Sequence, residues 1–163
     1  QQQIEQQNLI KDEQRTRLLE VLKNRIESLR QLSELASVYG VGDNSRFYGK
    51  FQEHIQLSKN KNQELMNDII EVADLLHNGV ISFLRENNSS LTKHELCYCG
   101  FIALGFSPES IRVLYNHTNI NSIYTTRRKI RSKLSLNAAY RDLEAYILEL
   151  GEKLGQRRSH NAL

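Results

Sequence analysis

Apolar residues recur at three- and four-residue steps through most of this chain, which is the spacing of one face of an α-helix. The first such run, Arg15–Ala36, predicts a long amphipathic helix. The residues before Arg15 interrupt its apolar register, so we expect the N-terminal turns to fray. A glycine-rich, polar break at 40–45 follows, and then an aromatic-rich second helix is expected. The apolar positions of that helix are Phe47, Tyr48, Phe51 and Ile55.

A third helix is predicted from a further apolar series at helical spacing. Its members are Leu65, Ile69, Val72, Leu76, Val80 and Phe83. The polar run 86–90 ends it and suggests a boundary between an N-terminal module (1–88), serving dimerisation and signal coupling, and a C-terminal domain (89–151). The sequence shows neither strand-like alternation nor an internal repeat. The predicted fold is therefore all-α, with a long helix and a helical hairpin followed by a four-helix domain.

The C-terminal domain carries clear signals for helix ends. Thr92 stands three residues before Glu95, the spacing of a capping box that starts a helix. Gly105 is placed to end this helix in the left-handed conformation. Ser107 and Pro108 then supply the cap and first residue of a second helix. Residues 116–119 form a polar turn, in which Asn119 is a candidate cap for the next helix.

The third helix of this domain is expected from Ile120 to about Leu134. Its inward positions are Ile120, Ile123, Ile130 and Leu134. Its other faces carry side chains able to hydrogen-bond to DNA, which makes them the candidate DNA-binding residues. They are Asn121, Ser122, Tyr124, Thr125, Arg127, Arg128, Arg131 and Lys133. A last helix is predicted from Asn137, through Ala138, Leu143, Ile147 and Leu150, to a stop at Gly151, with 152–163 as a flexible tail.

Charge is concentrated in the same domain. The 163-residue chain has a formal net charge of +3, whereas residues 91–136 hold seven basic and two acidic residues and so carry +5. The remaining residues therefore sum to −2. Positive charge gathered on one segment is typical of a surface that meets a phosphate backbone.

The residue pattern of this segment resembles the LuxR-type (GerE-like) helix-turn-helix. The matching positions are Leu91, Thr92, Glu95, Gly105, Ser107, Ile111, Ser122, Ile123, Ile130, Lys133 and Leu134. The chain departs from the pattern at Arg112, where the family has a small alanine, and in a turn that is one residue longer. Residues 105–134 are similar to a divergent Bacteroidetes branch, in which this domain forms the C-terminal part of sensor-regulators with tetratricopeptide repeats and a membrane span.

The resemblance implies a sequence-specific transcriptional regulator that binds double-stranded DNA as a homodimer. It also implies a cytoplasmic location for this segment and an inner-membrane anchor in the complete protein. Asn121, Tyr124, Thr125 and Arg128 lie in the half of the third helix that would enter the major groove, so we expect them to meet base edges. Arg127, Arg131 and Lys133 are expected to meet phosphates, unless one of them pairs with Glu95.

The apolar stripe of the first helix has two interpretations. Amphipathic helices usually bury such a stripe in their own core. The stripe is nevertheless broad, so part of it is a candidate dimer seam. A dimer would place two DNA-binding domains on two DNA half-sites. The seam candidates are Leu18, Leu22, Ile26, Leu29 and Leu32. The last helix of the C-terminal domain remains an alternative seam.

Other chemistry is not indicated. Cys97 and Cys99 are two residues apart on a helix, which suits neither a disulfide nor a zinc site, and we expect one in the core and the other half exposed. The five histidines lack ligand spacing, and no nucleophile elbow or phosphate-binding glycine loop occurs. We therefore expect no enzyme activity, no metal and no cofactor. No stretch has the roughly 18 apolar residues of a membrane span, so no membrane contact is expected.

Two further possibilities stay open. The chain begins Gln-Gln-Gln without a methionine, which suggests a piece of a longer polypeptide. A helix-turn-helix fold can also persist without DNA binding, and the chain would then be a helical protein-interaction module whose basic face binds an acidic partner. RNA polymerase is a third candidate partner, because a polymerase-binding sigma-factor region shares this helix arrangement.

Overall fold

The computed structural model describes residues 1–39, 49, 63–136 and 142–161. Seven helices and no strand occur in these ranges, so the all-α prediction is confirmed for this part of the chain. The helices are α1 (Gln2–Tyr39), α3 (Gln63–Leu76), α4 (Val80–Asn87), α5 (Lys93–Ala103), α6 (Pro108–Leu114), α7 (Asn121–Lys133) and α8 (Leu143–Asn161). The aromatic helix predicted at Phe47, Tyr48, Phe51 and Ile55, and the predicted cap Asn137 with Ala138, lie outside the described residues.

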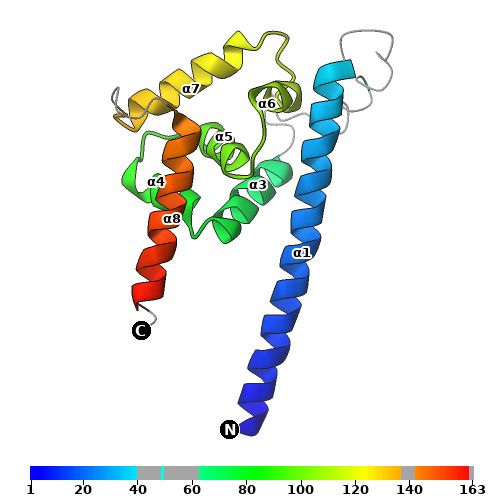
Figure 1. Ribbon diagram of the computed structural model, residues 1–163, viewed down its shortest axis with the longest axis vertical. Coiled ribbons are helices and arrows are strands. Elements are labelled where there is room, and N and C mark those ends of the chain that lie inside the picture. The colour runs from blue at the N-terminus through cyan, green and yellow to red at the C-terminus, as the bar shows by residue number, and fades with distance from the viewer. Residues whose placement is uncertain (40–48, 50–62, 137–141, 162–163) are drawn as a thin grey trace.

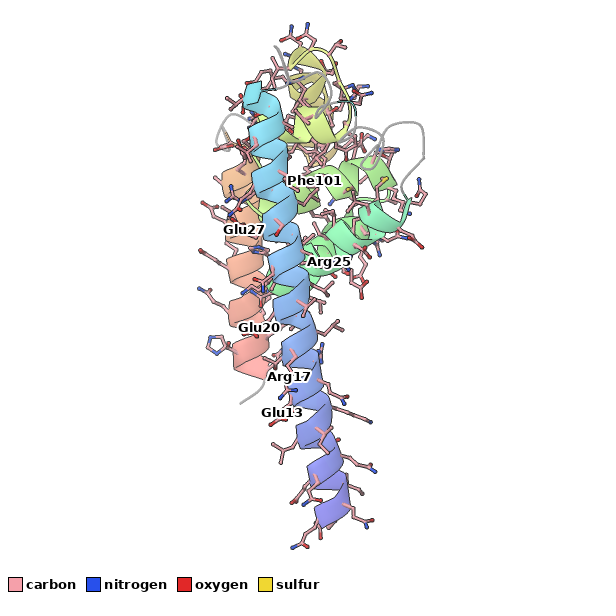
Figure 2. All side chains as sticks on the ribbon, turned by 90° about the vertical axis from the view of Figure 1, so that its right-hand side faces the viewer. Glu13, Arg17, Glu20, Arg25, Glu27 and Phe101 are labelled. Carbon is pink, nitrogen blue, oxygen red and sulfur yellow. The ribbon has the colours of Figure 1, made fainter. Side chains whose placement is uncertain are left out.

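Helix α1 is longer than the apolar pattern predicts. It begins at Gln2 and runs for 38 residues, so the N-terminal turns are helical. Glutamine, glutamate, lysine, arginine and leucine dominate this segment, and all of them favour helix whether or not they form an apolar stripe. Figure 1 shows the first half of α1 projecting from the body, and the side chains of residues 1–18 are all exposed (Figure 2).

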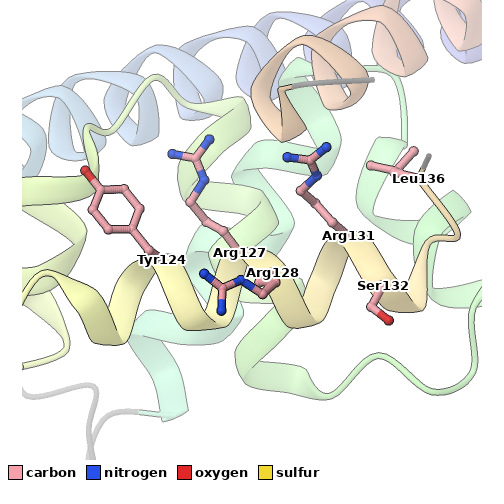
Figure 3. A pocket seen from close by; sticks show the side chains of 6 residues that line it. All are labelled: Tyr124, Arg127, Arg128, Arg131, Ser132 and Leu136. Atoms are coloured by element: carbon pink, nitrogen blue, oxygen red, sulfur yellow. The ribbon is translucent and has the colours of Figure 1, made fainter. Parts of the chain in front are cut away.

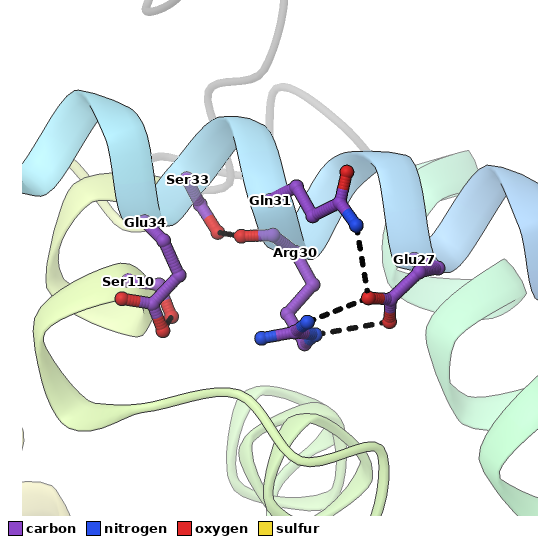
Figure 4. A network of polar contacts seen from close by, with 6 residues as sticks. All are labelled: Glu27, Arg30, Gln31, Ser33, Glu34 and Ser110. Carbon is purple, nitrogen blue, oxygen red and sulfur yellow. Dashed lines mark hydrogen bonds and ion pairs between the residues drawn. The ribbon is translucent and has the colours of Figure 1, made fainter.

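The second half of α1 packs against α6 and α3. Ser33 and Ala36 are completely buried there, which lets the backbones approach closely. Figure 4 shows Glu34 of α1 facing Ser110 of α6, and the Ser110 hydroxyl donates to a Glu34 carboxylate oxygen at 3.4 Å. A neighbouring bidentate pair between Arg30 and Glu27 stays within α1. Helix α1 is thus joined directly to the helix that precedes the turn of the predicted helix-turn-helix.

Helix α5 is the centre of the fold. Every residue from Glu95 to Ala103 is buried, because α3, α4 and α8 pack around it. The core is contiguous and joins residues on both sides of the predicted boundary near 88. It includes Met66, Leu84, Phe101, Ile130 and Ile147. The segment between α4 and α5 is therefore a turn of the chain and does not mark a gap in the core.

The predicted third helix is in fact two, α3 and α4. The chain turns sharply at Asn78 and Gly79, whose φ values are 60° and 81°. Asparagine and glycine tolerate this left-handed conformation better than other residues. Beyond the corner, the backbone N–H and hydroxyl of Ser82 both donate to the Asp74 carboxylate, which fixes the start of α4. The single-helix prediction was wrong because Val80 keeps the apolar spacing across the corner.

Helix α8 does not stop at Gly151. It continues to Asn161, so the segment predicted as a flexible tail is helical up to that residue. Gly151 is buried, and a Cβ atom there would lie 3.3 Å from the His77 carbonyl oxygen. The Asn78 side-chain amide also donates to the Gly151 carbonyl at 3.0 Å. This glycine therefore permits a close crossing of α8 over the α3–α4 corner.

The ends of α5 agree with the sequence prediction. Thr92 and Glu95 form both bonds of a capping box. At the other end Gly105 has a φ of 84°, and the N–H of Phe106 donates to the Phe101 carbonyl, as in a Schellman motif. The Phe101 and Phe106 rings pack with centroids 4.9 Å apart. The left-handed glycine thus turns the chain directly into α6.

Helix α6 starts as the sequence predicts. Ser107 accepts a hydrogen bond from the Ser110 N–H, and Pro108 occupies the first helical position.

Among the helices described, none is both long and apolar enough to cross a membrane.

Candidate nucleic-acid interface

The turn between α6 and α7 is closed by its own side chains. Asn116 has a φ of 54° and ends α6, and the His117 N–H donates to the Arg112 carbonyl. The Arg112 guanidinium in turn donates to the His117 carbonyl at 3.0 Å. Arg112 therefore supports the turn between α6 and α7.

Helix α7 begins after this turn. Asn119, predicted as a possible cap, accepts a hydrogen bond from the Asn121 N–H at 2.9 Å, although Ile120 is the residue that directly precedes the helix. The inward face of α7 agrees with the prediction, because Ile123 and Ile130 are buried. Ile120 and Leu134 are partly buried against the same core. These contacts fix which side of α7 faces outward.

The predicted base-reading residues lie on the outward side. Asn121, Thr125 and Arg128 are exposed, and the Tyr124 side chain is 44% exposed. The Thr125 hydroxyl donates to the Asn121 carbonyl of its own helix. Ser122 is half-buried, so it is less accessible than Asn121, Tyr124, Thr125 and Arg128.

Farther along, α7 borders an open groove of about 660 Å³ (Figure 3). Its lining residues are Tyr124, Arg127, Arg128, Arg131, Ser132 and Leu136. Arg127 and Arg131 are four residues apart, so they stand on successive turns, and Figure 3 shows both extending in the same direction. Three guanidinium groups therefore share one groove, in which planar donors match the oxygens of a phosphate.

Two of the predicted phosphate-binding residues are already engaged by carboxylates. Arg127 lies 2.5 Å from Glu144 and 3.3 Å from Asp142, at the start of α8. A hydrogen bond between these two acids lowers the pKa of Asp142, whereas burial and the same bond raise the pKa of Glu144. No local pattern in the sequence predicts this contact, because it depends on where the start of α8 lies relative to α7.

Lys133 is the second engaged cation. Its ammonium group lies 2.7 Å from Glu95 and also donates to the Ser90 carbonyl. The sequence left open that one of Arg127, Arg131 and Lys133 pairs with Glu95. This alternative is therefore confirmed, and the residue is Lys133. Partial burial favours the protonated acid, but hydrogen bonds from Lys133 and Thr92 outweigh it and hold the pKa of Glu95 below its ordinary value.

The pairs leave an uneven distribution of charge on α7. Arg128 and Lys129 are exposed. Arg131 is half-buried and lies close enough to Asp142 to help lower the pKa of that carboxyl, and Arg127 and Lys133 connect α7 to α8 and α5. Coulombic attraction to a polyanion would therefore come chiefly from the middle of the helix. The two pairs at its flanks serve to hold α7 in position.

The dimer-seam candidates divide into two groups. Ile26 and Leu29 pack against the chain's own core and Leu22 is half-buried. Leu18 and Leu32 are 59% and 41% exposed. They are two heptads apart and so share one face of α1.

The expectation for the cysteines was wrong in one respect. Cys97 and Cys99 are both fully buried, because neighbouring helices surround α5. Burial raises the pKa of each thiol to about 12, so both are inert thiols at neutral pH. No group of three or more possible metal-ligating side chains occurs in the ranges that the structure describes.

Comparison of the chain with protein-family models, with curated proteins and with solved structures finds no match.

Proposed function

We propose that this chain is a sequence-specific DNA-binding transcriptional regulator with a LuxR-like helix-turn-helix, in which α7 is the recognition helix. The observation that carries the proposal is the outward face of α7. Exposed hydrogen-bonding side chains occupy its first two turns, and three arginines line one groove along the rest. This combination offers contacts to base edges and to phosphates from a single helix.

The roles of the residues follow from their positions. Asn121, Tyr124, Thr125 and Arg128 are assigned to base edges, because they stand outward in the N-terminal half of α7. Arg131 is assigned to phosphate. Arg127 holds Glu144 and Asp142, so it would reach phosphate only by exchanging one anion for another.

The surroundings of α7 suit insertion into a groove. Helix α7 lies at one end of the body, and the free half of α1 projects toward the other end (Figure 1). The buried inward face of α7 and its pairs to α5 and α8 hold the helix as a rigid element. A rigid reader reduces the entropy lost on binding.

The same proposal includes a homodimer that uses the exposed face of α1. Leu18 and Leu32 would pack against their counterparts, while Ile26 and Leu29 stay in the core. Two readers related by a two-fold axis would then address half-sites about one DNA turn apart, roughly 34 Å. An upstream signal that shifts α1 would reach α6 through the Glu34–Ser110 contact.

A salt titration of binding to random and selected duplex DNA tests this proposal. The parent is compared with Arg128→Ala, Arg131→Ala and the control Arg85→Ala, which changes an exposed arginine on α4. We expect a sequence preference and a log–log salt slope of about −0.9 per phosphate contact. Arg128→Ala should relax the preference, Arg131→Ala should weaken binding evenly and reduce the slope by about one, and Arg85→Ala should change neither.

The rival function is a protein-interaction module whose basic face binds an acidic partner. The pairing of Arg127 and Lys133 with the chain's own carboxylates favours it, because fewer cations then remain for phosphates. Absence of DNA binding at low salt, by a chain whose circular dichroism shows it folded, would refute the DNA reader and leave this alternative. Equal loss of affinity in Arg85→Ala would show that only net charge matters.

A further inference from the structure

The exposed apolar residues in the second half of α1 form a stripe of their own. Its members are Leu18, Val21, Leu32 and Leu35, which are 59%, 55%, 41% and 50% exposed. The exposed residues Arg25 and Ser28 stand between the two apolar pairs. All six positions follow the alternating three- and four-residue steps of a heptad repeat, so they share one face of the helix.

This stripe is distinct from the side of α1 that packs on the body. The buried and half-buried residues of that side include Leu19, Leu22, Ile26, Leu29, Ser33 and Ala36. Each of them follows a stripe position by one residue, which places the two faces about 100° apart around the helix. A second helix along the stripe would therefore leave the contacts of α1 with α6 and α3 in place.

The stripe is symmetric about its midpoint, which falls between Ile26 and Glu27. Leu18 lies as far before this point as Leu35 lies after it, and Val21 and Leu32 correspond in the same way. An antiparallel α1 on a two-fold axis through the midpoint would thus bring apolar residues against apolar residues throughout. Any other antiparallel register leaves at least two of the four opposite a position outside the set.

Arg25 separates the two directions in which a second α1 could run. Figure 2 shows it near the middle of the helix. Parallel helices on a two-fold axis oppose each residue to itself, so two Arg25 guanidinium groups would meet within the seam and repel each other. In the symmetric antiparallel register, Arg25 instead faces the small Ser28 of the second copy. Its aliphatic stem can then cover apolar surface while its charged end stays in water.

A groove on α1 lies where this arginine stem would be received. It has a volume of about 490 Å³, and residues of α1 line it: Val21, Asn24, Arg25, Ser28, Leu29 and Leu32. The groove is at the middle of the stripe and hence at the proposed two-fold axis. The Arg25 stem of each copy would occupy the groove of the other, which makes this surface complementary to itself.

We propose that α1 pairs with α1 of a second copy in the antiparallel direction, in the register that opposes Leu18 to Leu35. This inference rests on the homodimer of the proposed function and fixes its direction and register. Ser33, where α1 is buried against the body, would stand opposite Glu20 of the second copy. The two bodies would thus attach about 20 Å apart along the seam, given a rise of 1.5 Å per residue.

Nitroxide labels on introduced cysteines measure the direction in the whole chain. Cys97 and Cys99 are buried, so labelling is directed to the new residue, in Glu13→Cys or in Lys23→Cys. Both positions are exposed on α1 and lie outside the stripe. In the antiparallel dimer, pulsed electron resonance should give about 40 Å or more between the two Glu13→Cys labels. The Lys23→Cys labels stay near the axis and should give about 20–30 Å.

The two labels also separate this inference from the homodimer itself. A parallel dimer would give about 20–30 Å for both variants, which would overturn the direction and leave the homodimer standing. Sedimentation of the parent as a monomer at all concentrations would overturn both. The salt titration with DNA tests the recognition helix independently of either outcome.

Ser28→Glu tests the register, with effects of opposite sign for the two directions. In the antiparallel dimer each new carboxylate would face Arg25 of the second copy, so we expect the Kd of the dimer to fall about three- to tenfold from two such pairs. In a parallel dimer the new carboxylates would face each other and raise the Kd. The control Gln6→Glu adds the same charge to α1 beyond the paired length, 14–39, and should leave the Kd unchanged. An unchanged or higher Kd in Ser28→Glu would overturn the proposal.

Discussion

The ammonium group of Lys133 lies 2.7 Å from the carboxylate of Glu95, and this pair joins the last turn of α7 to the first turn of α5. The same carboxylate accepts the N–H of Thr92 and completes the capping box. Glu95 is also buried, so both contacts act in a setting where water screens them little. One side chain therefore starts the central helix and positions the end of the recognition helix.

Stability should fall in acid because of this carboxylate. The pKa of Glu95 lies below its ordinary value of 4.5, so its contribution is complete above pH 4.5 and is lost as the pH falls through the lowered value in the folded state. Thermal melting between pH 2.5 and 7 should show a weaker acid dependence in Glu95→Gln than in the parent.

The companion variants separate the two contacts of Glu95. Lys133→Met should lower the free energy of unfolding by about 1 kcal/mol, and Glu95→Ala by about 2 kcal/mol, because the latter also removes the cap. Equal pH profiles for the parent and Glu95→Gln would contradict the assignment.

Substitution of Gly105 measures the cost of the left-handed backbone conformation alone, because an added side chain would meet no neighbouring atom. Its φ is 84°, and nothing lies within 4 Å of the position that a Cβ would occupy. Gly105→Ala should therefore lower the free energy of unfolding by about 1–2 kcal/mol through left-handed strain alone. Gly105→Asn should lose less, because asparagine tolerates this conformation. Chemical denaturation measures both, and an alanine variant as stable as the parent would show that the turn relaxes.

The proposed seam on α1 predicts that association and folding respond to different leucines. Leu18→Ser with Leu32→Ser should weaken the dimer in sedimentation velocity and leave the helical signal intact, because both residues are exposed. The matched pair Ile26→Ser with Leu29→Ser should lower the melting temperature, since these side chains pack on the core. A parent that sediments as a monomer at all concentrations, or a dimer unaffected by the first pair, would contradict the seam.

Local signals in the sequence were sufficient for the helix ends around α5 and α6. Thr92 with Glu95, Gly105 and Ser107 act within a few residues of themselves, so their roles can be read without knowing the fold. The inward face of α7 was predictable for a similar reason. Burial of Ile123 and Ile130 needs only a period of 3.6 residues.

Features that depend on two distant elements were not predictable. The burial of Cys97 and Cys99 together follows from α5 being surrounded, and the engagement of Arg127 follows from the approach of Glu144 on α8. Gly151 carries an ambiguous signal, because glycine serves both helix ends and close crossings. The corner at Asn78 was missed although Asn-Gly is a turn signal, since the apolar spacing continues through it.

The length of α1 has a mechanical consequence. From Gln2 to its buried contact at Ser33 the helix measures about 47 Å, at 1.5 Å per residue. If the helix pivots at this contact, a tilt of about 10° moves its N-terminal end by about 8 Å, given the length of about 47 Å. The relation also works in reverse, so a displacement of several ångströms applied at the N-terminal end becomes a small rotation delivered to α6. A large displacement at the N-terminal end of α1 is thereby reduced, at α6, to the scale on which neighbouring side chains rearrange.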